Sequence, residues 1–590
     1  MIVSSPEWST RTFGNEDRLP RVPVPTLPDS GRRFLEWCAP LLTPEELAET
    51  EAAVAEFLAP GSPAHELQAA LVEYDGSPGV HSWLDTFWPY RYLGRRDRIA
   101  LNANFFFLFQ DSPLGQVERA AELAAAAVDY KLRVDDELLP PVLVRGAPQS
   151  MVQHKFLFSA TRIPGAVLDT VRTPYREGWA GPSHERHIVV FHRNTPFRLD
   201  VLAEDGRPYS PEQIADGLRA IVKGDHATDV AAGHFTTKAR AEWAASRAAL
   251  IEAGNGEALE TIETALFCLC LDEFTPSTAL EACDRLLHGD SGNRWFDKAV
   301  SLVVFEDGTA GINVEHCELD GTTILGFTDA LLSGAREPRE AADGVPGFEP
   351  IEFTLTDALR EDARAAAEAF KAYADATATE AVSFDFGANR AKELGMSPDA
   401  FAQMSYQLAH RRAKGLTGAT YESIATRQFQ HGRTEAMRVV TPEVVRFADV
   451  LTDENASTDE KRKALRAAAA KHVARAKECQ AGDAPEQHLW ELQLIAQRRG
   501  DTETPALYTS PGWLKMRADY LSTSSAPSVN IQYFGFGSTS PQCIGVAYVL
   551  LPDRWNIYLS TPKHVSAEMY RFADELARAV RELQELLATE

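Results

Sequence analysis

Both halves of the 590-residue chain alternate strand-like and helix-like segments, and this alternation constrains the fold more than any other feature. A strand-rich region runs from about residue 80 to about residue 355, and an Ala/Glu/Lys/Arg-rich helix follows over 357–378. Near the C-terminus, a strand-rich segment (526–560) precedes an amphipathic helix (566–587). Because sheets and helices in such chains cover each other's apolar faces, the pattern predicts an α/β protein with layered domains.

The expected domain organisation follows from the same pattern. Residues 80–354 are expected to form one domain, and residues 18–79 together with 355–590 the other. Thr43 precedes Pro44 and two glutamates, which is typical of a helix N-terminus. Residues 457–460 read as a capping box at the start of a later helix. The two halves show no repeated sequence.

The charge balance excludes two classes of partner. The chain has 59 Lys and Arg against 85 Asp and Glu, so its formal net charge is −26. An acidic protein repels nucleic acid and anionic membranes, so neither is expected to bind. The longest strongly apolar run, residues 105–109, is far shorter than the roughly 20 residues that span a bilayer.

Cysteine usage and the N-terminal sequence indicate the compartment. Seven cysteines are scattered along the chain without CxxC spacing, which argues for a reducing compartment and against a disulfide framework or a structural zinc site. The first residues lack the basic-then-apolar pattern of a signal peptide. We therefore expect a cytoplasmic enzyme, a monomer, with no bound metal.

A histidine at the end of a predicted hairpin is the main candidate for chemistry. Two apolar runs, 301–305 and 310–314, flank a turn that contains Asp-Gly, which is a strong hairpin signal. His316 follows the second run, and Asp320 lies four residues further on, before a glycine. Imidazole titrates near neutral pH and is the usual general base. A hydrogen-bonded histidine without a catalytic role is the alternative interpretation.

The spacing His-x-x-x-Asp-Gly resembles the signature of CoA-dependent acyltransferases with the chloramphenicol acetyltransferase fold. Over nearly its whole length the chain resembles the choline/carnitine O-acyltransferases. The matching segments are 19–25 (LPRVPVP), 83–88 (WLDTFW), 162–165 (RIPG) with 169–170 (DT), 293–298 (NRWFDK), 396–401 (MSPDAF), 420–423 (TYES) and 521–524 (LSTS). The resemblance implies two chloramphenicol-acetyltransferase-like domains, each a mixed sheet flanked by helices, with the active-site tunnel at their interface.

The resemblance also implies a mechanism. His316 would take the proton of the acceptor hydroxyl, which attacks the acyl thioester directly without an acyl-enzyme. Ser524, the last serine of the Ser-Thr-Ser segment, would stabilise the oxyanion, and Ser522 would contact substrate. Asp320 would orient the site by pairing with Arg433. Read alone, residues 522–524 are merely a polar strand segment.

CoA is expected as a co-substrate, with no permanently bound cofactor. The family holds its 3′-phosphate with two lysines, and Lys392 falls on one of these positions while Ala388 occupies the other. Arg390 is a candidate replacement, and Asp399 matches an aspartate on the pantetheine side. Because only one of the two phosphate-binding lysines is present, an acyl group donated by an acyl carrier protein remains an alternative to acyl-CoA.

Three positions describe the acceptor's carboxylate site. Tyr421 and Thr434 match the tyrosine and threonine with which carnitine-specific members bind that carboxylate. The arginine of those members is replaced by Gln487. A lost charged hydrogen bond costs roughly 1.5–3 kcal/mol, so carnitine itself is not assured as the acceptor.

Aromatic residues describe the rest of the substrate pocket. Phe536 matches a ring that faces a trimethylammonium group, where a cation–π contact contributes about 0.5–2 kcal/mol. Trp88 and Tyr92 resemble an aromatic pair of the acceptor pocket, with spacing one residue short and Pro89 between them. Phe534 falls where short-chain members of the family have methionine and longer-chain members have glycine, so the resemblance and the bulk of the ring predict a short acyl group.

The sequence therefore predicts an O-acyltransferase that moves a short acyl group between CoA and a small carnitine- or choline-like acceptor. Two alternatives remain: an enzyme that takes its acyl group from a carrier protein, and a non-catalytic acyl-CoA-binding protein. His316 and Ser524 favour an enzyme, because a binding protein requires neither side chain.

Overall fold

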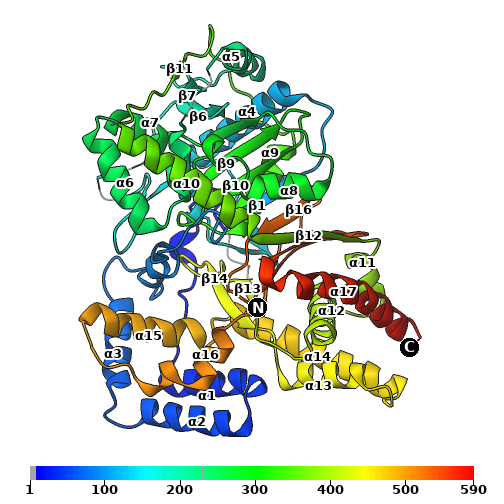
Figure 1. The fold of residues 1–590 in the computed structure, drawn as a ribbon. Coiled ribbons are helices and arrows are strands. Elements are labelled where there is room, and N and C mark those ends of the chain that lie inside the picture. Colours follow the sequence, from blue (N-terminus) through cyan, green and yellow to red (C-terminus); the bar gives the residue numbers. More distant parts are fainter. Residues whose placement is uncertain (1–7, 177, 180, 227, 229, 590) are drawn as a thin grey trace, which may run out of the picture. The chain divides into compact units, whose positions relative to one another are not determined.

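The computed structural model describes residues 8–589 except 177, 180, 227 and 229. The chain forms two compact units, each with its own sheet (Figure 1). Unit 1 contains the chain up to Leu19, Trp88–Thr377 and Ser528–Gly537. Unit 2 contains Pro20–Phe87, Ala378–Pro527 and the chain from Ser538 onward. The predicted α/β class, with a mixed sheet in each of two domains, is confirmed.

Unit 1 is built on an eight-stranded sheet in the order β11-β7-β6-β8-β9-β10-β1-β16. Its central strands β6, β8 and β9 are parallel, and the outer neighbours are antiparallel. The strands are β1 (Phe105–Phe109), β6 (His187–His192), β7 (Thr195–Asp200), β8 (Cys268–Asp272), β9 (Val300–Phe305), β10 (Ala310–Val314), β11 (Phe348–Pro350) and β16 (Ile531–Phe536). Two small hairpins are β2 (Leu143–Val144) with β3 (Ala147–Pro148), and β4 (Thr161–Ile163) with β5 (Thr170–Arg172).

The helices of unit 1 are α4 (Gln116–Asp135), α5 (Pro211–Lys223), α6 (Arg240–Glu252), α7 (Gly256–Thr264), α8 (Ala279–Leu287), α9 (Gly321–Leu332) and α10 (Asp357–Asp375). The predicted hairpin is confirmed as β9 and β10, with Ala310 opposite Val304. Its turn depends on Gly308, whose φ of 86° lies in the left-handed region that glycine adopts without steric cost.

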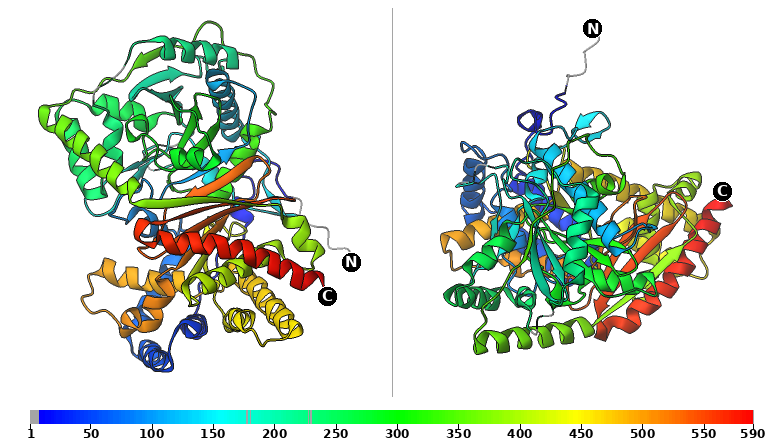
Figure 2. Two further views of the ribbon diagram at one scale, coloured as in Figure 1. Left: turned by 45° about the vertical axis from the view of Figure 1, so that its right-hand side comes forward. Right: turned by 90° about the horizontal axis from the view of Figure 1, so that it is seen from above.

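Unit 2 contains a six-stranded sheet in the order β12-β18-β17-β15-β13-β14. Strands β13, β15 and β17 are parallel, and β14 and β18 are antiparallel to their neighbours. The strands are β12 (Thr377–Phe384), β13 (Thr420–Ala425), β14 (Thr434–Arg438), β15 (Leu521–Ser525), β17 (Ile544–Leu550) and β18 (Trp555–Pro562). One sheet face packs on α12 and α17, and Figure 2 shows α17 in red lying along the strands.

The helices of unit 2 are α1 (Leu27–Cys38), α2 (Pro44–Leu58), α3 (Pro63–Asp75), α11 (Ala388–Glu393), α12 (Pro398–Lys414), α13 (Pro442–Thr452), α14 (Thr458–Gln480), α15 (Glu486–Arg499), α16 (Pro511–Arg517) and α17 (Ser566–Ala588). The capping box predicted at Ser457 is present, and Thr43 caps α2 in the same way. Among the described residues, no helix combines the length and the apolar composition needed to cross a bilayer.

The observed units differ from the expected domains in one instructive segment. Residues Ser528–Gly537 were expected in the C-terminal domain, but they belong to unit 1 because β16 pairs with β1. In Figure 1 the orange strand β16 continues the sheet of unit 1. The other boundaries lie at Phe87 and Thr377 instead of residues 79 and 354, since α10 packs with unit 1.

Candidate active site

His316 lies where the chain leaves strand β10. A turn with Glu318 in the left-handed region (φ 68°) brings the Leu319 carbonyl oxygen back toward the ring. His316 Nδ1 lies 3.0 Å from that oxygen and 3.4 Å from Asp320 Oδ1. A carbonyl oxygen can only accept, so Nδ1 carries the proton, and in the neutral imidazole Nε2 holds the free lone pair. The histidine is thus oriented with its basic nitrogen away from the turn.

Aromatic rings surround this imidazole. Tyr92 stacks on His316 with ring centroids 4.7 Å apart and planes inclined by 15°, and Phe105 of β1 lies 5.1 Å away. Trp88 stacks in turn on Tyr92 at 6.1 Å. Tyr92 lies in a π-helical turn, Pro89–Leu93, which begins directly after Trp88. The His316 side chain is therefore only 19% exposed.

Asp320 is held by a residue that sequence reasoning missed. Gln153, which is buried, donates from Nε2 to Asp320 Oδ2 over 3.0 Å. Its Oε1 accepts from the Asp320 backbone N–H (2.9 Å) and from the Thr323 hydroxyl (2.6 Å). No local pattern identifies Gln153, because it lies far from the histidine motif in sequence. Arg433, the expected partner of Asp320, belongs to unit 2, and that pairing stays a prediction.

A buried ion-pair network supports the histidine from behind. Arg162 pairs with Glu315, the residue before His316, over 2.9 Å and with Asp169 over 2.6 Å. Its Nη2 donates to the Tyr92 carbonyl oxygen at 3.0 Å. Burial works against the charge on Arg162, but the two carboxylates raise its pKa above the ordinary value. Arg162 thereby fixes the two residues that position the ring.

The network continues away from the site. Arg240 pairs with Asp169 over 2.7 Å and with Asp297 over 2.8 Å. Trp243 donates to Asp297 over 2.6 Å. Burial raises the pKa of Asp297 to about 6, although Arg240 opposes the shift. The sequence segments that carried the family resemblance around residues 162, 169 and 297 are thus structural supports.

Phe534 and Phe536 extend the aromatic group from strand β16. Phe534 lies opposite Phe107, and Phe536 lies opposite Phe105. The Phe534 ring is 6.1 Å from Phe105 and 5.5 Å from Phe107, both edge to face. Phe534 is only 6% exposed, so it fills the space beside the phenylalanine that contacts His316.

In unit 2, four predicted substrate residues share one sheet face. Tyr421 pairs with Ser522, and the pairing continues toward Ser524 on β15. Since side chains alternate along a strand, Ser522 and Ser524 face the same side as Tyr421. Thr434 lies opposite Ala425, four residues beyond Tyr421, and so belongs to that side. The opposite face, with Leu521 and others, joins the hydrophobic core.

Gln487 lies on α15 beside this face. Its Nε2 donates to the Thr434 carbonyl oxygen over 3.0 Å, and its side chain is buried. Within the described part of the chain, Gln487 Oε1 has no hydrogen-bond donor. The preceding Glu486 forms a bidentate pair with Arg438 at 2.7 and 2.8 Å, and Arg438 also pairs with Asp519. Arg438 was not predicted; its position opposite Tyr421 is visible only from the register.

Asp399 is half-exposed and lies at the edge of a polar cluster whose other members, Glu422 and His472, are buried. Its carboxylate accepts from the Tyr548 hydroxyl at 2.7 Å and faces His472 Nε2 at 2.9 Å. Burial opposes ionisation, but the His472 contact lowers the pKa of Asp399. Burial and the nearby Asp399 raise the pKa of Glu422 well above its ordinary value. The pair thus favours one ionised and one protonated carboxyl group.

The two predicted phosphate contacts lie on the short helix α11. Arg390 pairs with Glu393 over 3.0 Å at the surface, a kind of contact that contributes about 0–1 kcal/mol. Lys392 is exposed. The predicted residues thus fall into two groups. Unit 1 brings together Trp88, Tyr92, His316, Asp320, Phe534 and Phe536, and unit 2 carries Arg390, Lys392, Asp399, Tyr421, Thr434, Gln487, Ser522 and Ser524.

Comparison with known proteins identifies the class. Carnitine O-palmitoyltransferase 2, mitochondrial, from Mus musculus is 31% identical, over 92% of this chain and 88% of that protein. Carnitine O-acetyltransferase from Homo sapiens is 29% identical, over 98% of this chain and 95% of that protein. Among solved structures, trichothecene 15-O-acetyltransferase from Fusarium sporotrichioides matches 83% of this chain and 92% of that chain, with a TM-score of 0.37 and 10% identity.

These relatives define the protein as an acyl-CoA-dependent acyltransferase, an enzyme that transfers acyl groups between CoA and a hydroxyl acceptor. The sequence model described as "Choline/Carnitine o-acyltransferase" matches residues 22–578. The chain belongs to the choline/carnitine O-acyltransferase family, which confirms the resemblance noted in the sequence.

Proposed function

We propose that this protein transfers a short acyl group between CoA and the hydroxyl of a small acceptor, with His316 as the general base. The observation that carries the proposal is the anchored Nδ1 of His316, which leaves Nε2 as the proton acceptor. The acceptor oxygen gives its proton to Nε2 and attacks the thioester carbonyl carbon. The C–S bond then breaks, and the imidazolium returns the proton to the CoA thiolate.

A correctly placed general base contributes about 10²–10⁴-fold to the rate. Two further side chains, Ser524 and Asp320, are proposed to assist His316. Ser524 is proposed to donate to the oxyanion, a contact whose loss costs about 10²–10³-fold in comparable enzymes. Asp320, fixed by Gln153, is a positioning residue that keeps His316 in one orientation.

The acceptor is proposed to be a small quaternary-ammonium alcohol that is recognised differently from carnitine. Phe536 supplies an aromatic face for the cation. Gln487 presents a neutral amide where carnitine-specific members have arginine, and its Nε2 is already engaged with the Thr434 carbonyl oxygen. The unsatisfied Oε1 accepts rather than donates, so this position favours an acceptor with a hydroxyl or N–H group.

The acyl group is proposed to be short because Phe534 is packed between other rings beside the phenylalanine that contacts His316. The donor is proposed to be acyl-CoA. A carrier-protein donor is the second candidate, favoured by Ala388 in place of a phosphate-binding lysine and by the engagement of Arg390 with Glu393.

The proposal is tested by measuring free thiol released from acetyl-CoA in the presence of carnitine, choline and other hydroxylated amines. We expect release that depends on one acceptor and that falls with octanoyl-CoA. Acetyl-dephospho-CoA separates the two donor hypotheses: equal rates with both donors would show that the 3′-phosphate is not recognised. A wild-type protein that binds acetyl-CoA but releases no thiol with any acceptor or acylated carrier would contradict the enzymatic proposal.

A further inference from the structure

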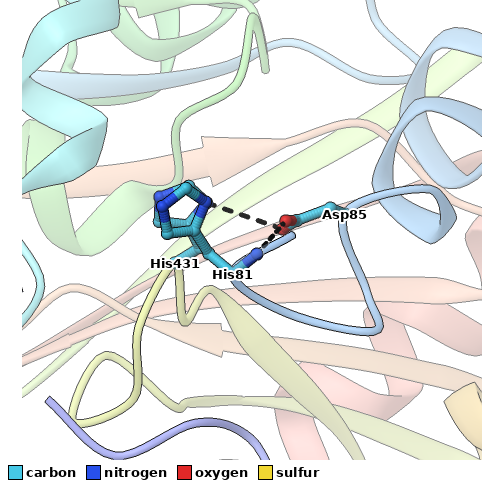
Figure 3. Close-up of side chains that lie close together, drawn as sticks. All are labelled: His81, Asp85 and His431. Atoms are coloured by element: carbon cyan, nitrogen blue, oxygen red, sulfur yellow. Dashed lines mark hydrogen bonds and ion pairs between the residues drawn. The ribbon is translucent and has the colours of Figure 1, made fainter. Parts of the chain in front are cut away.

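A second group of ionisable side chains lies in unit 2, apart from the residues proposed for acyl transfer. His81 and Asp85 are on the segment that follows α3, and His431 is on the loop between β13 and β14. Figure 3 shows the two imidazoles overlapping, with the Asp85 carboxylate at their edge. The rings stack with centroids 4.2 Å apart and planes inclined by 21°. One nitrogen of each ring and one carboxylate oxygen lie within 4.8 Å of one another.

Backbone contacts hold the carboxylate in place. Asp85 Oδ2 accepts from the backbone N–H groups of His81 (3.1 Å) and Ser82 (3.2 Å). The other oxygen, Oδ1, is turned toward His431 and lies 3.6 Å from its Nδ1. One carboxylate oxygen of Asp85 therefore holds the local backbone, while the other lies close to the nitrogens of the two imidazoles.

His431 reaches this position through an uncommon backbone conformation. Its φ of 50° lies in the left-handed region, which costs a non-glycine residue of order 1 kcal/mol or more. The conformation turns its ring onto that of His81, a residue far away in sequence. The side chains of His431 and Asp85 are 32% and 25% exposed, so the group is reachable from solvent and is not part of the core.

We propose that His81, Asp85 and His431 bind a transition-metal dication of the Zn²⁺ type. Imidazole nitrogens with one carboxylate oxygen are a donor set that suits zinc and its neighbours, whereas Mg²⁺ and Ca²⁺ prefer oxygen ligands. A tetrahedral zinc site with bonds of about 2.0–2.2 Å separates its ligand atoms by about 3.3–3.6 Å. The His431–Asp85 separation of 3.6 Å meets this value. A metal ion lies in the plane of each imidazole that binds it, so His81 has to rotate out of the stack before its nitrogen completes the set.

A second cluster of potential metal ligands in the described chain, with two carboxylates and one imidazole, shows the contrast. Asp399, Glu422 and His472 also place ligand atoms within 4.8 Å of one another. There, however, the Asp399 oxygens already accept hydrogen bonds from Tyr548 and face His472, so the protein supplies the partners itself. The proposed site keeps a carboxylate oxygen directed at an imidazole without such a hydroxyl. A metal ion bound there would link the loop before Thr434 to the segment after α3.

The test is a calorimetric titration of the chelator-treated full-length protein with Zn²⁺, and separately with Mg²⁺, at neutral pH. We expect one Zn²⁺ per chain and no Mg²⁺ binding. His431→Asn keeps a residue that tolerates the left-handed conformation, and Asp85→Asn keeps an oxygen for the two backbone donors. Each variant should weaken Zn²⁺ binding at least tenfold.

His564→Ala, at an exposed histidine of the same unit, is the matched control and should bind Zn²⁺ like wild type. Thermal unfolding without metal checks that the variants are folded. The proposal is overturned if wild type binds no Zn²⁺, or if folded variants with all three residues replaced bind it as tightly as wild type. Because the readout is binding, neither result depends on whether His316 is a general base.

Discussion

The two units repeat one sheet topology with very different sequences. In unit 1 the hairpin β6–β7, the single strand β8 and the hairpin β9–β10 follow each other along the chain, and they lie in the order β7-β6-β8-β9-β10. In unit 2 the hairpin β13–β14, the strand β15 and the hairpin β17–β18 occur in the corresponding order along the chain. They lie in the sheet in the order β14-β13-β15-β17-β18. A helix follows the last hairpin in both units, α9 in one and α17 in the other.

The comparison extends to a histidine after the last strand. His316 precedes Asp320 by four residues, and in unit 2 His564 precedes Glu568 by four residues. His564 is exposed, and Glu568 pairs with Lys414 over 3.3 Å. A histidine and an acid at this spacing after a strand therefore do not by themselves produce the enclosed, hydrogen-bonded imidazole found at His316. The surroundings of the two histidines differ.

The surroundings differ because the sheets are extended differently. Beyond β10, unit 1 adds β1 and β16, and Phe105 of β1 contacts the His316 ring. Beyond β18, unit 2 adds only β12, a strand with several polar residues. The added aromatic strands and the buried Arg162 network thus hold the His316 imidazole in one orientation, whereas the described part of unit 2 gives the histidine at the corresponding strand end no such support from added aromatic strands.

The largest expected effect is on the free energy of unfolding, and it concerns Glu315, the residue directly before His316. Glu315→Ala leaves Arg162 buried without one of its two carboxylates, which should lower the free energy of unfolding by about 3–5 kcal/mol. Lys563→Ala, at the exposed equivalent position in unit 2, should change it by no more than about 1 kcal/mol, the usual upper contribution of an exposed charge and its partner. Urea unfolding measures both values. Equal changes in the free energy of unfolding for the two variants would contradict the view that buried ion pairs support the strand end at His316 more strongly than the one at His564.

A smaller effect concerns the acceptor face of unit 2. Gln487→Arg should strengthen binding of carboxylate-bearing acceptors such as carnitine by about 1.5–3 kcal/mol, or ten- to more than a hundredfold. Gln487→Met, which is uncharged, is the control and should give no such gain. Steady-state KM values for carnitine and choline show the change. An arginine variant with unaltered preference would separate Gln487 from acceptor recognition.

The smallest effect concerns acyl length in unit 1. Phe534→Gly removes a ring from the group beside Phe105 and should raise the rate with octanoyl-CoA relative to acetyl-CoA by roughly tenfold, about 1.4 kcal/mol. The ratio of kcat/KM for the two donors is the measurement, and it does not depend on the amount of folded protein. No relative gain with octanoyl-CoA would contradict the assignment of Phe534 as the limit on acyl length.

Local signals in the sequence predicted local structure correctly. The Asp-Gly turn gave the β9–β10 hairpin, and Thr43 and Ser457 marked helix starts, because each depends on neighbouring residues. The placement of residues 531–536 was wrong, since their strand character does not determine which sheet they join. Gln153 and Arg438 were missed for the same reason: their partners are distant in sequence. The family resemblance supplied candidate site residues that spacing alone could not, and their roles stay predictions.

We propose that His316, and not its counterpart in unit 2, takes the acceptor's proton. Acceptor-dependent thiol release from acetyl-CoA should fall about 10²–10⁴-fold in His316→Ala, while His564→Ala should retain wild-type activity. Both proteins should unfold at wild-type temperature. Folded His316→Ala with undiminished thiol release would contradict the account.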